Sequence, residues 1–123
     1  MPINVNDLAY LIDIYENSID IISFTKDVKY IEFEKSIMRR KAVERSFEII
    51  GEAANRISKE TLLSLPNIPW SKIIAFRNKI AHDYGEILIE FIWNISQKNI
   101  PELLNELMKI NDLMAYLNNN YDE

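Results

Sequence analysis

Apolar residues recur at every third or fourth position along most of this chain, which is the spacing of amphipathic helices. In the first such stretch they fall at Leu8, Leu11, Ile12, Tyr15, Ile19 and Ile22. The chain has only 2 glycines and 4 prolines, whereas a fold of many short strands needs frequent turn residues. The pattern therefore predicts an all-α fold, an up-and-down bundle of four to five helices.

The limits of the expected helices follow from the apolar stripes and from helix-breaking residues. The stripes cover about residues 6–22, 30–58, 69–82, 86–97 and 101–117, with Asn6 or Asp7 as the expected first N-cap. Residues 65–69 are expected to be a connector, because two prolines three apart cannot both lie inside a helix. Pro101 suits the first turn of the last helix. Residues 1–123 are expected to form one domain that ends in a polar tail from about residue 118.

The second expected helix carries a glycine and a row of charges. Gly51 lies beside the apolar stripe, so we expect it to permit a close helix crossing. Glu48 and Glu52 belong to a charged stripe that is typical of an exposed helix face. Because Glu52 follows Gly51, a second interpretation is that its carboxylate reaches toward the helix at 69–82.

Charge and composition narrow the class of protein. The net charge of −5 and the pI near 4.9 argue against a protein that coats nucleic acid. A local basic patch is nevertheless formed by Arg39, Arg40, Lys41 and Arg45. It is either a solvated helix face or an RNA-binding surface with strong salt dependence.

Other classes are disfavoured by what the chain lacks. It has no cysteine and a single histidine, which argues against disulfides and a zinc site and fits a reducing compartment. No apolar run approaches the roughly 20 residues of a membrane span, and the first residues do not resemble a signal peptide. We therefore expect a cytoplasmic protein with no metal, no cofactor and no membrane partner.

The segment Arg77-Asn78-Lys79-Ile80-Ala81-His82-Asp83-Tyr84 holds the only histidine. Histidine is the side chain whose unperturbed pKa, about 6.5, lies closest to neutral pH. Arg77 and His82 are five residues apart, about 7.5 Å along a helix, a gap that a long guanidinium can span. An arginine fork matches phosphate oxygens, and an imidazole can move a proton to or from a ribose oxygen. Asn78, four residues before His82, can orient the imidazole.

Acid–base cleavage of RNA is easiest with two proton-transfer groups, and this chain has one histidine. A twofold homodimer would place two Arg77 and two His82 in one cleft, and twofold homodimers are the commonest oligomers. The histidine count therefore motivates a homodimer hypothesis.

Ordinary structural roles remain open for the same residues. A histidine near a helix end is often a cation that favours the helix dipole. Tyr84 is more often a packing residue with a solvated hydroxyl, and Trp70 and Trp93 are typical core or interface anchors.

The residues also carry a family resemblance. The stretch Arg77-Asn78-x-x-x-His82-x-Tyr84 resembles the R-x-x-x-x-H-x-Y signature of the HepT-like branch of HEPN-domain proteins. Residues 42–54, with their Gly-Glu-Ala segment, resemble the second helix of that branch. Ile68-Pro69-Trp70, Trp93 and Pro101-Glu102-Leu103 fit as well, so the resemblance spans about residues 5–117.

This resemblance implies a small all-α toxin of a type VII toxin–antitoxin pair. Such toxins are metal-independent ribonucleases that cleave tRNA or mRNA in a cleft across a homodimer. Arg77 and His82 would be catalytic and Asn78 and Glu52 supporting. Tyr84 would be the tyrosine that a cognate MntA-like nucleotidyltransferase antitoxin adenylylates with ATP, which adds bulk and negative charge to the cleft. The alternative is a non-catalytic HEPN subunit that partners a nucleotidyltransferase.

Overall fold

The computed structural model describes residues 2–82 and 86–121 of the chain. Within these ranges it contains seven helices and no strand. They are α1 (Val5–Thr25), α2 (Tyr30–Lys35), α3 (Ile37–Arg56), α4 (Lys59–Ser64), α5 (Trp70–His82), α6 (Glu86–Leu107) and α7 (Asn111–Tyr121). None of these described helices is long and apolar enough to cross a membrane.

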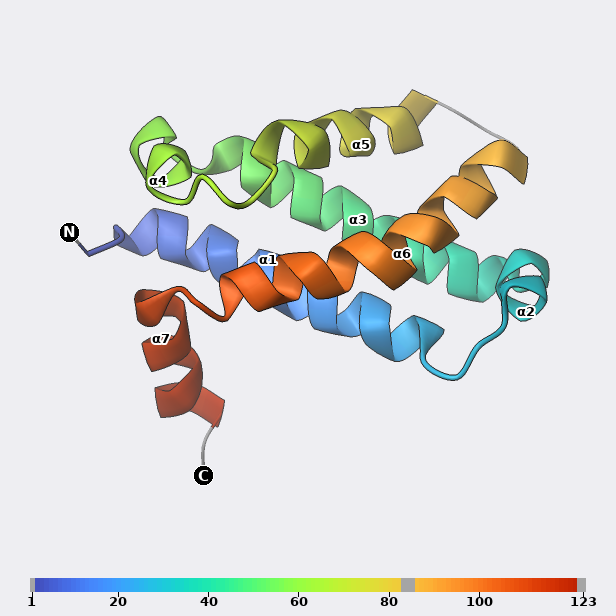
Figure 1. The fold of residues 1–123 in the computed structure, drawn as a ribbon, viewed down its shortest axis with the longest axis horizontal. Helices are drawn as coiled ribbons and strands as arrows, with labels where there is room; N and C mark the ends of the chain where they lie inside the picture. Colours follow the sequence, from blue (N-terminus) through green and yellow to red (C-terminus); the bar gives the residue numbers. More distant parts are fainter. Residues whose placement is uncertain (1, 83–85, 122–123) are drawn as a thin grey trace.

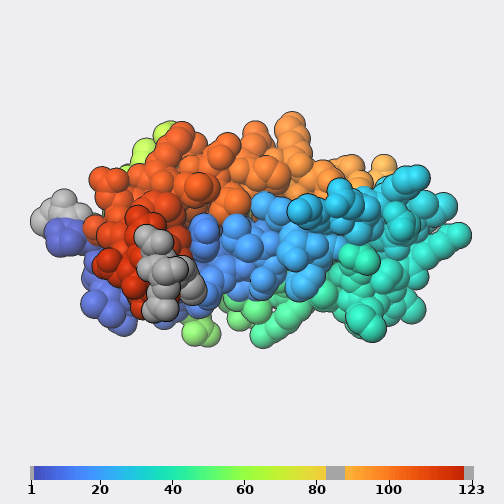
Figure 2. All heavy atoms as spheres, turned by 90° about the horizontal axis from the view of Figure 1, so that it is seen from below, coloured from blue at the N-terminus to red at the C-terminus, as the bar shows by residue number. Residues whose placement is uncertain are grey.

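Four long helices, α1, α3, α5 and α6, run alternately in opposite directions (Figure 1). Helix α1 packs against both α3 and α6, and α3 packs in turn against α5. Helix α7 lies across the end that holds the start of α1 (Figure 2), where the backbone N–H of Ile3 donates to Asp112 Oδ2 at 2.7 Å. The predicted all-α, up-and-down bundle is confirmed, although short helices raise the number above four to five.

The core lies where α1 meets α3 and α6. Its fully buried side chains include Leu11, Ile14 and Ile21 of α1, Val43 of α3 and Leu107 of α6. On α6 one buried face runs through Leu88, Ile92, Ser96, Ile100, Leu103 and Leu107. This spacing of three or four residues is that of a single continuous helix.

Pro101 does not open a last helix, as the sequence predicted, but lies inside α6. Proline has no N–H to donate to the carbonyl four residues earlier and normally ends or kinks a helix. Here Ile100 and Leu103 on either side of it are buried, and burial of such side chains contributes roughly 1.5–3 kcal/mol each. Packing therefore outweighs the local preference, and the helical break comes after Leu107 instead.

The segment predicted as one helix over 30–58 is divided at Ser36. The backbone of Ser36 is extended, and its hydroxyl accepts from Arg39 N at 3.2 Å, which caps α3. A serine that can bond its neighbouring backbone competes with helix continuation. Ser58 likewise caps α4, a helix that the sequence did not predict, whereas residues 65–69 form the predicted connector.

The N-terminal cap of α1 is Asn4 rather than Asn6 or Asp7, because the Asn4 side chain accepts from Asp7 N. Asp7 is buried and has another role. Its carboxylate accepts from the backbone N–H and hydroxyl of Ser58 at 3.0 and 2.5 Å and from the Thr61 hydroxyl at 2.6 Å. These bonds fasten the start of α1 to the junction of α3 and α4.

Replacing this buried carboxylate tests how much that fastening contributes. Burial alone would raise the pKa of Asp7, but the hydrogen bonds from Ser58, Thr61 and Asn4 outweigh it and lower the pKa below 3.8. A lowered pKa stabilises the fold above the ordinary value of the group, and that stability is lost as the pH falls through the folded-state pKa. Asp7→Asn should therefore lower the free energy of unfolding by about 1–3 kcal/mol at pH 7, and the gap should shrink in acid.

Urea denaturation at several pH values measures this gap. Asp20→Asn, at an exposed position of the same helix, is the matched control and should change stability little. An equal loss in both variants, or a gap that does not respond to acid, would contradict the role of Asp7.

Candidate functional site

The site is built where α3 and α5 cross closely at Gly51. A Cβ atom at Gly51 would overlap the Cβ of Arg77 and lie 2.7 Å from its Cγ. Real Cβ atoms do not approach this closely, so only glycine fits opposite the stem of Arg77 at this separation. The close crossing that Gly51 predicted is confirmed, and the residue it accommodates is the arginine of the motif.

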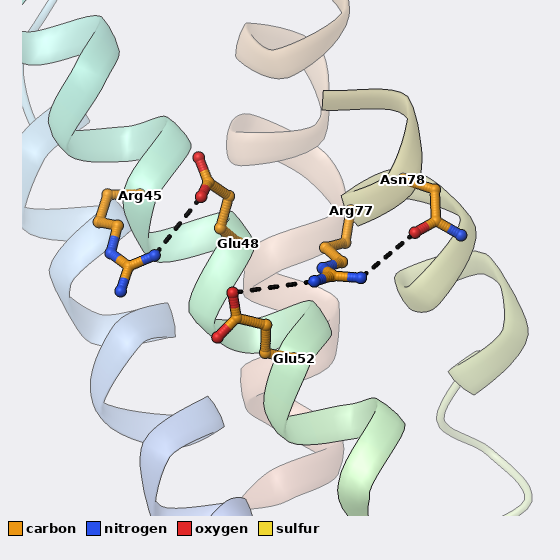
Figure 3. Close-up of polar contacts among 5 residues, drawn as sticks. All are labelled: Arg45, Glu48, Glu52, Arg77 and Asn78. Carbon is orange, nitrogen blue, oxygen red and sulfur yellow. Dashed lines mark hydrogen bonds and ion pairs between the residues drawn. The ribbon is translucent and has the colours of Figure 1, made fainter. Parts of the chain in front are cut away.

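The guanidinium of Arg77 lies between one side chain of α3 and one of its own helix (Figure 3). Its Nη2 atom is 3.9 Å from Glu52 Oε1, and its Nη1 atom donates to Asn78 Oδ1 at 3.5 Å. Both contacts are long, since charge-assisted N–H···O bonds are usually about 2.7–2.9 Å. The side chains of Arg77 and Glu52 are 38% and 39% exposed. The guanidinium is therefore positioned but not tightly bound, and a ligand can reach it.

Glu52 thus reaches α5, in line with the second interpretation of its place beside Gly51. Asn78 contacts Arg77, whereas its orientation of the His82 imidazole stays a prediction. The structure brings Arg77, Glu52 and Asn78 together.

His82 is the last residue of α5 and is exposed. It follows Arg77 by five residues, about 7.5 Å along the axis and about 140° around it at 3.6 residues per turn. The two side chains therefore leave α5 in different directions, Arg77 toward α3 and His82 toward another side. Tyr84, the expected modification site, lies outside the described residues.

The predicted basic patch divides into two parts. Arg39 is half-buried and its Nη1 atom donates to the carbonyl of Phe24 at 2.6 Å, which satisfies a carbonyl in the last turn of α1. Arg40 is half-buried too, whereas Lys41 and Arg45 are exposed. Arg45 pairs with Glu48 at 3.4 Å on α3, about one turn from Glu52 (Figure 3). Lys41 and Arg45 are therefore the members of the patch that face solvent.

Acidic residues are interleaved with this patch. Glu44, Glu48 and Glu52 follow one another at intervals of four along α3 and share a face. Burial raises the pKa of Glu44, as does Glu48, while Arg40 and Lys41 act in the opposite direction. In the described part of the chain no three histidine, aspartate or glutamate side chains gather closely enough to hold a metal ion.

A groove of about 740 Å³ that the sequence did not predict separates α5 from α6. Its floor includes Phe47, Ile73 and Phe76, and its rim carries Lys72 and Lys79 on one side and Glu102 and Glu106 on the other. Phe91, which the sequence assigned to an apolar stripe, is 42% exposed at this groove, with Lys79 Nζ 5.5 Å from its ring centroid. Helical periodicity placed Phe91 beside buried neighbours and could not show that its side chain lines an open surface.

Comparison of the sequence with known proteins identifies a family. The family model described as "HepT-like: Ribonuclease HepT-like" matches residues 14–110. "Putative RNase MJ1380" and "Putative RNase MJ0127" of Methanocaldococcus jannaschii are each 39% identical, over 80% and 83% of this chain and 91% and 84% of theirs. "Probable ribonuclease HepT" of Thermococcus cleftensis is 32% identical over 82% of this chain and 92% of its own. Among solved structures none matches significantly.

The contact between Gly51 and Arg77 can be tested by moving the glycine from position 51 of α3 to position 77 of α5. Gly51→Ala should destabilise the fold, because overpacking costs about 1–3 kcal/mol and helix propensity returns at most about 1 kcal/mol. Arg77→Gly removes the opposing Cβ. We therefore expect the double variant Gly51→Ala, Arg77→Gly to be more stable than the sum of the single effects by about 1 kcal/mol or more.

Urea denaturation of the four proteins of this cycle gives the coupling free energy. Asn55→Ala, at an exposed position of α3, replaces Gly51→Ala in the control cycle and should be additive with Arg77→Gly. If the changes in the free energy of unfolding are additive in both cycles, the two helices can separate at Gly51 without destabilising the fold, and the steric contact does not matter.

Proposed function

The chain belongs to the HepT-like ribonuclease family, and from this membership we propose that it is a metal-independent endoribonuclease that cleaves tRNA or mRNA. We propose further that it is the toxin of a type VII toxin–antitoxin pair. The observation that carries the proposal is that the matched region includes both Arg77 and His82, and that both side chains are open to solvent.

In the proposed reaction Arg77 binds the scissile phosphate. Arginine keeps its charge at every relevant pH, and its fork matches two phosphate oxygens. Because the contacts of Arg77 with Glu52 and Asn78 are long, a phosphate can replace them at little cost. In this proposal His82 supplies a proton-transfer group, and the exposed Lys41 and Arg45 bind the RNA backbone. With a net charge of −5, RNA binding should depend strongly on salt.

A homodimer would complete the site. Arg77 and His82 leave α5 about 140° apart, which favours a site in which the imidazole of one copy serves the guanidinium of the other. The groove between α5 and α6 offers the second copy an apolar surface with exposed Phe91. Its basic rim on α5 and acidic rim on α6 become complementary when two copies meet about a twofold axis along the groove.

The cognate partner in this proposal is a nucleotidyltransferase antitoxin that adenylylates Tyr84. Tyr84 is two residues beyond His82 in the sequence. An attached AMP would bring a phosphate and a nucleoside next to the groups that receive the RNA phosphate. Repulsion and steric exclusion would then silence the ribonuclease.

Cleavage of end-labelled tRNA and mRNA in the presence of EDTA tests the activity. Wild-type protein, shown by intact mass to be unmodified, should cut, and Arg77→Ala and His82→Ala should each lose about 100-fold or more in rate. Arg56→Ala, at an exposed arginine near the end of α3, is the charge-matched control and should retain activity. If unmodified wild-type protein cuts neither RNA, a non-catalytic subunit that partners a nucleotidyltransferase becomes the better account.

Mixing two inactive variants tests whether the site is shared between copies. In a dimer of Arg77→Ala with His82→Ala, one of the two shared sites keeps both groups. An equal mixture should therefore recover about a quarter of the wild-type rate, because about half of the dimers are mixed and each holds one working site. Native mass spectrometry verifies that mixed dimers form. Mixed dimers that stay inactive would contradict the shared site, and a wild-type protein that is monomeric while it cuts RNA would contradict the dimer.

A further inference from the structure

The proposed cleavage requires two proton transfers, and the chain supplies one histidine and no cysteine. The 2′-hydroxyl must lose a proton as it attacks phosphorus, and the leaving 5′-oxygen must gain one. Each of the two shared sites of the proposed dimer holds one His82, so if that imidazole performs one transfer, a second group is needed beside the phosphate. This inference rests on the proposed ribonuclease activity.

Carboxylates are the next candidates, and Glu52 is the one that the structure places against Arg77. Its Oε1 atom lies 3.9 Å from Arg77 Nη2, and its side chain is 39% exposed. A 2′-hydroxyl lies close to the adjacent phosphate in RNA. A phosphate bound by Arg77 would therefore bring the 2′-hydroxyl within reach of Glu52.

The fold holds this carboxylate in place. Glu52 follows Gly51, which packs closely against the stem of Arg77, and precedes the buried Ala53 and Ala54. Its backbone cannot shift without opening the contact with Arg77. A proton-transfer group needs this kind of fixed position, because it must lie within hydrogen-bond distance of the proton that it takes.

Other carboxylates are less well placed. Glu48 lies one turn away and pairs with Arg45 at 3.4 Å. Asp7 belongs to α1 and is buried, where it accepts bonds from Ser58 and Thr61 at the α3–α4 junction. Among the carboxylates of the described residues, Glu52 is the one that is both partly exposed and paired with Arg77.

We propose that Glu52 is the general base of the reaction and His82 the general acid. The carboxylate of Glu52 takes the proton of the 2′-hydroxyl, and the 2′-oxygen forms a bond to phosphorus. The bond from phosphorus to the 5′-oxygen breaks, and the 5′-oxygen takes a proton from the His82 imidazolium. The products are a 2′,3′-cyclic phosphate and a free 5′-hydroxyl, with one proton gained by Glu52 and one lost by His82.

The separation of the two groups agrees with this assignment. In an in-line displacement the attacking and leaving oxygens lie on opposite sides of phosphorus, so base and acid must approach from different directions. Glu52 and Arg77 face each other within one copy, whereas in the proposed shared site His82 comes from the other copy and so approaches from another side. The length of the Glu52–Arg77 contact also matters, because a tightly bound carboxylate would compete with the phosphate for the guanidinium.

The test compares Glu52→Gln, Glu52→Asp and Glu48→Gln with wild-type protein on an oligonucleotide that carries the mapped cleavage site. Glu52→Gln should lower kcat by about 100- to 10,000-fold and remove the acid limb of the pH–rate profile, in which the base becomes protonated. Glu52→Asp keeps a carboxylate and should recover part of the rate. Glu48→Gln should stay within about threefold of wild type, since its side chain pairs with Arg45 rather than Arg77.

A second substrate separates the base from the acid. A 5′-phosphorothiolate linkage, with sulfur in place of the 5′-oxygen, has a leaving group that needs no proton. It should restore much of the rate of His82→Ala but not that of Glu52→Gln. A merely structural role of Glu52 would produce neither the altered pH profile nor this difference between substrates.

The outcomes separate this assignment from the proposed function. If wild-type protein cuts RNA and depends on Arg77 and His82, but Glu52→Gln keeps its rate and its acid limb, the general-base role is wrong and the ribonuclease stands. If the 5′-phosphorothiolate substrate rescues Glu52→Gln as well as His82→Ala, Glu52 is not the base. If wild-type protein cuts no RNA, the proposed function fails and this role fails with it.

Discussion

The contact between Gly51 and the stem of Arg77 is the constraint on which the site depends. It sets the separation of α3 and α5, and it places Glu52 beside the guanidinium. A larger residue at position 51 would move Arg77 away from α3, so one missing Cβ determines both the packing and the position of the charged groups. The helices are held by apolar burial, but their exact separation at this crossing is decided by sterics.

The polar groups of this bundle are of two kinds: some are buried and stabilise the fold, and others are partly exposed at the candidate site. Asp7 is buried and accepts short hydrogen bonds from Ser58 and Thr61, which bind α1 to the α3–α4 junction. Arg77 and Glu52 are partly exposed, and their charged groups are 3.9 Å apart, between Arg77 Nη2 and Glu52 Oε1. The hydrogen bonds of Asp7 cannot be replaced by contacts with a ligand without destabilising the fold. The long contact between Arg77 and Glu52 can be replaced in this way. This difference predicts that substitutions at Arg77 or Glu52 change the rate of the proposed cleavage more than the free energy of unfolding.

Sequence periodicity predicted the all-α bundle, the helices α1 and α5 and, within a longer segment, α3, because each of these buries a stripe of apolar residues. It also predicted the close crossing at Gly51, since a glycine beside an apolar stripe has few other uses. It failed where local and tertiary preferences conflict: Pro101 lies within α6 because Ile100 and Leu103 are buried on either side. The groove between α5 and α6 was missed for a related reason, since a stripe of apolar residues does not reveal which of them remain uncovered.

The proposed binding of an RNA phosphate by an acidic protein depends on where its charges lie. The overall charge of −5 disfavours binding along an extended surface, and Arg39 is already engaged with the carbonyl of Phe24. The exposed cations Lys41 and Arg45 lie along α3 among Glu44, Glu48 and Glu52, and Arg77 of α5 lies opposite Glu52. In the proposed function we expect such mixed charges to attract RNA weakly. A carboxylate is tolerated beside a phosphate only where a cation adjoins it, and for Glu52 that cation is Arg77. Selectivity in this site should therefore come from where charges lie rather than from how many there are.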